Sequence, residues 1–320
     1  MGAIQLILSG GHSSAAKGGE WGFERVKAAL KPLPFPTAGC VVLNTGREEQ
    51  NNETKKIVVK ILALMSSYRK RGNTARIVEM IEAEMGALAA RREEPLEFEM
   101  LYLGHVEIEF CRGCRTCFDR GEEQCPLKDD VPAIRAKIDA ADGIILASPV
   151  YVDDVNGVLK NWIDRMAYIC HRPAFADKCV YLVATVADSP TSHALRTMMM
   201  AFRTWGAHIV GQAGYKMGAL MDSDEAERRF SGDTAEVAEA LFKAVSKREY
   251  LRPSFLALMI FKIQQLSWQQ AADPDSVDYS YWKGQGWFDP DCTFYIEHQA
   301  NPVKVGLARL TGTVLTRFVT

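Results

Sequence analysis

The sequence predicts an α/β fold in which helices wrap a doubly wound, five-stranded parallel sheet. From about residue 56 to residue 216, short apolar runs alternate with longer amphipathic ones, which is the pattern of strands joined by helices. The short runs are rich in Val, Ile, Leu and Ala, as strands buried on both faces require. Hydrophobic side chains make up 48% of the 320 residues, enough for a sizeable core.

Five apolar runs are the expected strands, and amphipathic segments follow each of them. The strands are expected at Ile57 to Met65, Phe98 to Leu103, Gly143 to Ser148, Lys178 to Thr185 and Ala207 to Gln212. The helices are expected from about Asn73 to Ala90, from Asp129 onward, from Asn156 to Met166, from Thr191 to Trp205 and from Glu225 to Lys247. Asp129 and Asp130 would set carboxylates at the positive end of the second helix dipole.

The regular pattern divides the chain into three parts. We expect an N-terminal extension over residues 1–55, a central domain over 56–249 and an aromatic and helical C-terminal extension over 250–320. The segment from Trp268 to Tyr295 is rich in aromatic residues, which predicts a packing arm. After Asn301 and Pro302, a helix start signal, one face carries Val303, Leu307, Leu310, Val314 and Phe318.

Charge and hydropathy exclude several classes of function. The 38 basic and 40 acidic residues leave a net charge of -2, so we expect no broad cationic face and no nucleic-acid partner. No apolar run approaches the roughly 18 residues that span a bilayer, so no membrane span is expected. The first residues lack a basic leader before an apolar stretch, which favours a cytoplasmic location.

The loop after the first strand has the composition of a phosphate site. It carries Ser67, Arg69 and Gly72, and the next helix opens at Asn73 and Thr74. Helix N-terminal amides, hydroxyls and a guanidinium can bind phosphate oxygens. The loop is neither a Walker loop nor a dinucleotide fingerprint, so a monophosphate is preferred. The alternative is an ordinary capped helix with a basic loop in solvent.

A second loop, together with the first, gives the sequence a specific family resemblance. Pro149, Val150 and Tyr151 follow the third strand, and Asn156 precedes a Leu-Lys-x-x-x-Asp-Arg helix. Together with the first loop, this resembles the flavodoxin-like NAD(P)H-dependent FMN reductases over residues 56 to 216. The resemblance implies a flavodoxin-like sheet whose ligand lies beyond the strand ends. It implies FMN held by Ser67, Arg69, Gly72, Asn73, Thr74, Pro149, Val150, Tyr151 and Asn156. Tyr68, where the family often has proline, and Ser66, where it often has glycine, depart from the pattern.

Four of the eight cysteines lie within fifteen residues. Cys111, Cys114, Cys117 and Cys125 follow the pattern Cys-x2-Cys-x2-Cys-x7-Cys in a loop of about residues 105–128. Three evenly spaced cysteines are typical of ferredoxin-like ligation, so the spacing favours a [4Fe-4S] cluster. Two alternatives stay open: a zinc site, which usually has two separate Cys-x2-Cys pairs, and free thiols near the flavin.

The cysteine motif, followed by Lys128, Asp129 and Asp130, resembles the iron-sulfur flavoprotein branch of this family. That resemblance implies an FMN-dependent oxidoreductase that passes electrons between the cluster and FMN to a small acceptor. A ferredoxin-type protein or NAD(P)H would be the donor, and the chain would form a homo-oligomer, a dimer or a tetramer. The alternatives are a flavin-only reductase and a non-catalytic flavin-binding interaction protein. No catalytic residue is assigned.

Overall fold

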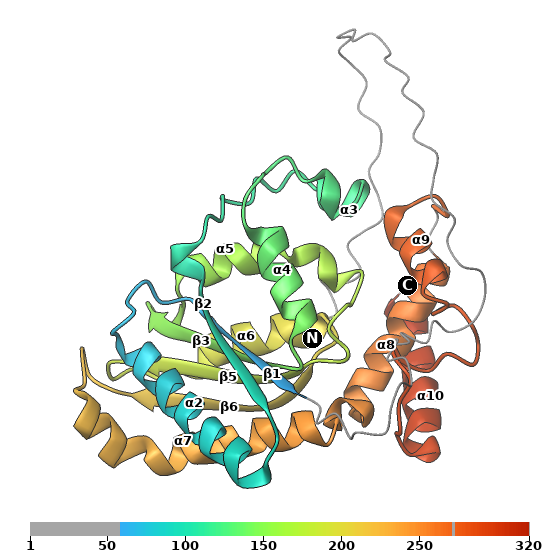
Figure 1. The fold of residues 1–320 in the computed structure, drawn as a ribbon. Coiled ribbons are helices and arrows are strands. Elements are labelled where there is room, and N and C mark those ends of the chain that lie inside the picture. The colour runs from blue at the N-terminus through green and yellow to red at the C-terminus, as the bar shows by residue number, and fades with distance from the viewer. Residues whose placement is uncertain (1–57, 271–272, 320) are drawn as a thin grey trace, which may run out of the picture.

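The structure is a computed structural model that describes residues 58–270 and 273–319, and its centre is a parallel sheet (Figure 1). Its strands run in the order β2 (Leu96–Tyr102), β1 (Val59–Met65), β3 (Gly143–Tyr151), β5 (Cys179–Val186) and β6 (His208–Lys216). Counted along the chain, this order is 2-1-3-4-5, as in flavodoxin-like folds. The predicted five-stranded flavodoxin-like sheet is confirmed, with the short antiparallel β4 (Asp154–Val155) added beside β3.

Helices cover both faces of the sheet, which makes the fold doubly wound (Figure 1). On one face lie α2 (Asn73–Arg92) and α7 (Ser223–Ser246). On the other lie α4 (Val131–Ala140), α5 (Gly157–Arg165) and α6 (Ser192–Thr204). Each helix buries an apolar stripe, as amphipathic helices do, and the two faces form separate hydrophobic clusters.

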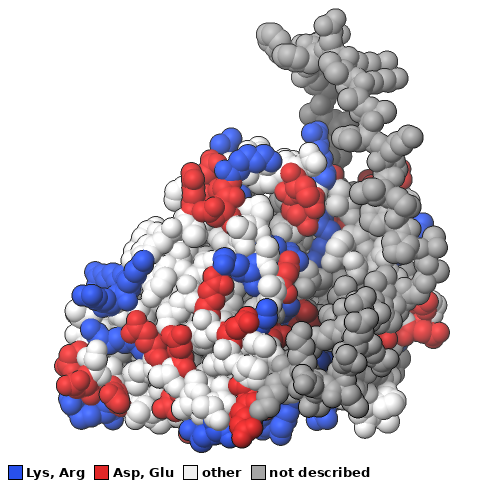
Figure 2. All heavy atoms as spheres, in the orientation of Figure 1, with Lys and Arg blue, Asp and Glu red and all other residues white. Residues whose placement is uncertain are grey.

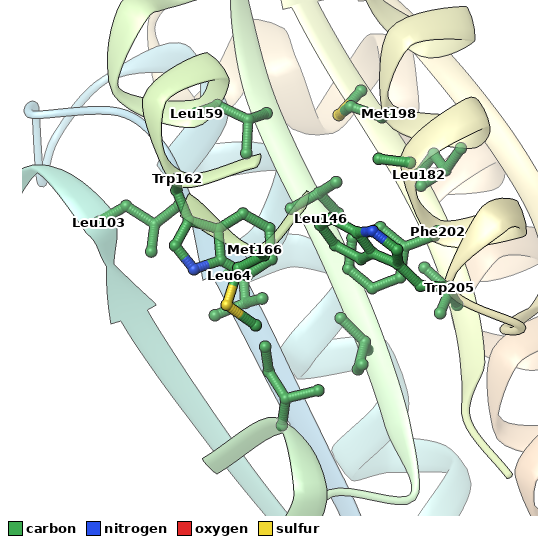
Figure 3. Packing of buried hydrophobic residues seen from close by; sticks show 14 of the residues in the cluster. Leu64, Leu103, Leu146, Leu159, Trp162, Met166, Leu182, Met198, Phe202 and Trp205 are labelled. Carbon is green, nitrogen blue, oxygen red and sulfur yellow. The ribbon is translucent and has the colours of Figure 1, made fainter. Parts of the chain in front are cut away.

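Large aromatic side chains fill the cluster under α5 and α6 (Figure 3). Trp162 and Trp205 meet edge to face, with ring centroids 5.6 Å apart. Phe202 packs against both, with its ring centroid 5.1 Å from Trp205 and 6.2 Å from Trp162. Edge-to-face pairs stabilise a core beyond the area that they bury, so α5 is fixed firmly against the sheet.

Two strands are longer than the sequence predicts. β3 continues beyond Ser148 to Tyr151, and β6 continues beyond Gln212 to Lys216. β6 is an edge strand, and its hydrogen bonds to β5 extend to Lys216 although its last residues carry little apolar signal. The described part of β1 begins at Val59, and the expected N-terminal extension lies outside the described residues.

The C-terminal extension forms its own packed unit beside the sheet (Figure 1). It contains α8 (Phe255–Gln269), α9 (Val277–Gly284) and α10 (Pro302–Val319). Their shared core includes Phe261, Trp282, Trp287 and Tyr295. Within the described ranges, no helix combines the length and the apolar character that crossing a membrane requires.

Candidate functional site

Four loops meet at the carboxyl edge of the sheet. They follow β1, β3, β5 and β6, four strands that are neighbours in the sheet. Open α/β sheets bind ligands at this edge, where the strand order reverses. The order reverses between β1 and β3, and the two predicted flavin loops are those that follow these strands. The topology therefore brings them together.

The loop after β1 presents backbone amides and a cation at the start of α2. The first N–H groups of a helix have no acceptor within it, and Gly72 offers no side chain to cap them. A Cβ at Gly72 would lie 3.1 Å from the Cβ of Arg69, so glycine keeps this turn tight. Ser67 Oγ accepts the Arg69 N–H at 3.1 Å, and the Arg69 side chain is exposed. This arrangement fits a phosphate group.

Two predicted phosphate ligands direct their side chains to other parts of the protein, the loop after β6 and strand β5. Asn73 Nδ2 donates to the Gly218 carbonyl at 3.1 Å, and Asn73 Oδ1 accepts the Met221 N–H at 3.0 Å. The buried Thr74 hydroxyl lies 2.6 Å from the Thr185 hydroxyl. In this structure the Asn73 side chain joins α2 to the loop after β6, so the group that Asn73 can offer an anion is its backbone N–H.

Tyr151 lies at the end of β3 with its side chain 55% exposed. Val152 (φ 50°) and Asp153 (φ 67°) turn the chain back into β4, as a two-residue hairpin requires. A β-branched residue in this region carries a conformational cost of about 1–3 kcal/mol. Pro149 and the largely buried Val150 precede the ring. An exposed ring at this edge can stack on a flat heteroaromatic ligand.

Asn156 joins the loop after β1 to the segment after β3, and its side chain is buried. Its Nδ2 donates to the Ser66 carbonyl at 2.8 Å, and its Oδ1 accepts the Leu159 N–H at 3.2 Å, which caps α5. Ser66 Oγ also donates to Ser148 Oγ at 3.0 Å. Since Asn156 is only 3% exposed and both polar ends of its side chain are engaged, it positions the loops instead of presenting its side chain to a ligand.

The four spaced cysteines lie on the segment between β2 and α4, which contains the one-turn helix α3 (Thr116–Asp119) and a 3-10 turn (Glu122–Gln124). We call residues 106–130 the cysteine loop. Gly113 (φ 62°) and Gly121 (φ 102°) are in the left-handed region, where glycine costs least. The Cys111 N–H donates to Asn161 Oδ1 at 3.1 Å, which ties the loop to α5.

A buried ion pair fixes the base of the cysteine loop. The side chains of Arg165 and Asp129 are 4% and 0% exposed. Arg165 also donates to the Glu109 carbonyl at 2.9 Å and lies 3.9 Å from Cys125 Sγ. Burial alone would raise the pKa of Asp129, but hydrogen bonds from Arg165 and from two backbone amides outweigh it and lower that pKa. The carboxylate is therefore held in its charged form.

All four thiols line one cavity of about 600 Å³. They are free; Cys111 and Cys114 are exposed, whereas Cys117 and Cys125 are half-buried. Burial and the neighbouring Cys125 and Cys111 raise the pKa of Cys117, whereas hydrogen bonds with Thr116 lower the pKa of Cys114. Among the described residues, no three His, Cys, Asp or Glu side chains are close enough to hold a metal ion. The donor set suits soft metals, but its atoms are not gathered around one centre.

Sequence reasoning missed the residues that hold the cysteine loop. Within α5, Lys160 pairs with Asp164 at 2.6 Å, whereas Arg165 reaches the loop. Asn161 and Arg165 are four residues apart, so they share a helix face, and this spacing is the signal that could have found them. Thr185, which contacts Thr74, has no such signal because its partner is distant in sequence.

The surface seen in Figure 2 carries Lys and Arg side chains interspersed with Asp and Glu side chains. On this face the two signs of charge are mixed.

Comparisons with known proteins match mainly the sheet domain. Residues 59–219, about half of the chain, match the family model described as NADPH-dependent FMN reductase. An iron-sulfur flavoprotein of Archaeoglobus fulgidus is 27% identical over 233 residues, which are 71% of this chain and 99% of that protein. Another, from Methanocaldococcus jannaschii, is 40% identical over 107 residues, which are 33% of this chain and 51% of that protein. Among solved structures, the apo form of an NADH:FMN oxidoreductase is 18% identical with a TM-score of 0.40, covering 56% of this chain and 88% of that one.

Proposed function

The chain belongs to the NADPH-dependent FMN reductase family and is an FMN-dependent oxidoreductase, and from this premise we propose that it passes electrons between a [4Fe-4S] cluster and FMN to reduce a small acceptor. The observation that carries the proposal is the cavity lined by four free thiols on a domain of this family. Its relatives in Archaeoglobus fulgidus and Methanocaldococcus jannaschii are iron-sulfur flavoproteins.

We propose that FMN binds at the carboxyl edge of the sheet. Its phosphate would meet the backbone amides at Gly72, Asn73 and Thr74, together with Ser67 and Arg69. Its ring would lie against the segment Pro149 to Tyr151. Asn156 would keep the phosphate loop and the ring loop in register, since it hydrogen-bonds to Ser66 and caps α5.

The cluster is proposed to bind Cys111, Cys114, Cys117 and Cys125. FMN exchanges one or two electrons and a cluster exchanges one at a time, so the pair can connect a one-electron donor to a two-electron reduction. The chain's own contribution is to hold the thiol-bearing loop. Asn161 and Arg165 bind its backbone, and Arg165 brings a positive charge close to Cys125.

Exposed side chains beside the cysteines support a protein electron donor. Phe110 is 81% exposed, and it precedes exposed Cys111 and Arg112. An exposed aromatic ring beside cationic side chains is a common anchor for a protein partner. We therefore propose a ferredoxin-type donor at the cysteine loop, with NAD(P)H as the alternative donor at the flavin.

One observation favours a second candidate function, a flavin-only NAD(P)H-dependent reductase of quinones or similar acceptors. The described residues contain no group of three side chains close enough to hold a metal ion. In that case the cysteines would bind zinc or remain free thiols.

We further propose that the chain forms a homo-oligomer in a reducing compartment such as the cytoplasm. Exposed Val303, Leu307, Leu310 and Val314 on α10 support association. Their steps of four, three and four residues match a helix-pairing seam. An antiparallel pair of α10 helices would set leucine opposite leucine and valine opposite valine. The thiols of Cys111, Cys114, Cys117, Cys125, Cys170 and Cys179 are free, in keeping with a reducing compartment.

The test is an anaerobic absorbance spectrum with assays of FMN, iron and acid-labile sulfide. We expect one FMN and one cluster per chain. Serine at Cys117 should lower the iron and sulfide content but leave FMN bound, whereas the matched control Cys170→Ser, also at a half-buried thiol, should change neither. Stoichiometric zinc without sulfide would favour the flavin-only reductase. Bound FMN without turnover with any electron donor would indicate a non-catalytic flavin-binding interaction protein.

A further inference from the structure

Buried Arg172 connects the cysteine loop to the C-terminal extension. Its side chain is 3% exposed. The guanidinium donates to the Cys117 carbonyl at 2.6 Å and to Glu122 Oε2 at 2.9 Å, both in the loop. It also pairs with the carboxylate of Asp278 in α9. One cation thus holds the part of the loop that carries Cys117 and a helix more than a hundred residues away in sequence.

His171 strengthens the same connection. Its Nδ1 lies 2.7 Å from Asp278 Oδ2, and its carbonyl accepts the Trp282 Nε1–H at 2.8 Å. Its ring meets Phe118 of α3 at 4.7 Å and Trp268 of α8 at 5.1 Å, centroid to centroid. The helices α3 and α9 are in direct contact. His171 and Arg172 therefore both join the cysteine loop to the C-terminal extension.

Asp278 is the acidic centre of this cluster. It is 6% exposed and accepts from Arg172 and His171 together. Arg172 Nε has no hydrogen-bond partner in the described part of the chain. Loss of the Asp278 charge would leave the buried guanidinium with the partly exposed Glu122 as its carboxylate partner among the described residues. Removal of one partner of a buried pair is strongly destabilising because the other charge remains.

We propose that the C-terminal extension positions the Cys117–Glu122 part of the cysteine loop, and that Asp278 is its positioning residue. The extension lies outside the stretch that matches the family model, residues 59–219. The inferred consequence, retention of the cluster, rests on the proposed function. The ordering of the cysteine loop by the extension does not depend on the proposed function.

The test is hydrogen exchange in the full-length protein, as purified and after iron removal. In Asp278→Asn, the amides of residues 115–125 should exchange about tenfold faster or more, because a charge-assisted hydrogen bond within a buried pair is weakened. Iron and sulfide should also be lost faster from the variant. The matched control Asp275→Asn changes an exposed aspartate three residues away and should leave exchange unchanged.

If Asp278→Asn does not fold, Trp282→Phe replaces it in the hydrogen-exchange test. It removes the hydrogen bond to the His171 carbonyl and keeps an aromatic ring, and it should also speed exchange of residues 115–125. Unchanged exchange in the folded variants would overturn the inference. Wild-type protein without iron or sulfide would overturn only the proposed cluster, because the exchange measurement does not need one.

Discussion

At the residue scale, the predicted flavin ligands differ in what their side chains are free to do. Arg69 and Tyr151 are exposed at the carboxyl edge. The side chains of Asn73, Thr74 and Asn156 bind other parts of the protein. The first group can contact a cofactor directly, whereas the second holds the loops in place.

Arg69→Ala should weaken FMN binding. The loss of a hydrogen bond to a charged phosphate costs about 1.5–3 kcal/mol, so the dissociation constant should rise about tenfold or more. Flavin fluorescence titration of the apoprotein measures it. The control is Arg91→Ala, at an exposed arginine in the last turn of α2. Equal affinity in Arg69→Ala and wild type would remove Arg69 from the phosphate site.

At the element scale, α5 serves two regions with two faces. Leu159 and Trp162 point into the core, while Asn161 and Arg165 bind the cysteine loop. A helix that is fixed firmly in the core is a rigid support for a loop with little secondary structure of its own. Asp129 Oδ1 accepts the Val131 N–H at the start of α4, as expected of a carboxylate at the positive end of a helix, and Asp129 also pairs with Arg165. Asp130 Oδ2 accepts the Glu107 N–H at 2.8 Å.

Arg165→Met should destabilise the fold by about 3–5 kcal/mol, because it leaves the buried Asp129 carboxylate without its cation. The free energy of unfolding in urea measures this loss. The double variant Asp129→Asn with Arg165→Met removes both charges and should recover part of it. If the losses of unfolding free energy in Asp129→Asn and in Arg165→Met simply add in the double variant, the two charges are not coupled.

At the scale of the whole molecule, α10 packs with small residues on its inner face and several large apolar side chains on its outer face. Its inner face contains Ala308 and Gly312, and a Cβ on Gly312 would lie only 3.0 Å from the Met259 carbonyl of α8. The two helices therefore approach closely. By contrast, Val303, Leu307 and Leu310 are more than half exposed. Such a row of exposed aliphatic side chains usually marks an interaction surface.

Leu310→Lys should shift the protein from oligomer toward monomer. It sets a charge in the seam proposed between two α10 helices, where burial of each leucine contributes about 1.5–3 kcal/mol. Sedimentation velocity at several concentrations measures the mass. The control Gln299→Lys adds the same charge at another exposed position. A wild-type chain that is monomeric throughout, or a variant with unchanged mass, would contradict the pairing.

The sequence by itself determined the sheet, its helices and the places of the two loops that are predicted to bind the flavin. These depend on local information: apolar runs mark buried strands, and short motifs at strand ends mark loops. The spacing of Cys111, Cys114, Cys117 and Cys125 identified the thiol loop for the same reason. Strand ends were less certain, since the last residues of β6 are fixed by pairing with β5 and not by their own hydropathy.

Only the tertiary structure decided which polar side chains support the site. Arg172 joins Cys117, 55 residues earlier, to Asp278, 106 residues later, and Thr74 meets Thr185, 111 residues later. Such contacts leave no periodic signal, because they arise when separate elements pack and buried polar groups must find partners. Sequence motifs could name the groups that face a ligand, whereas the groups that hold them appear only once the chain is folded.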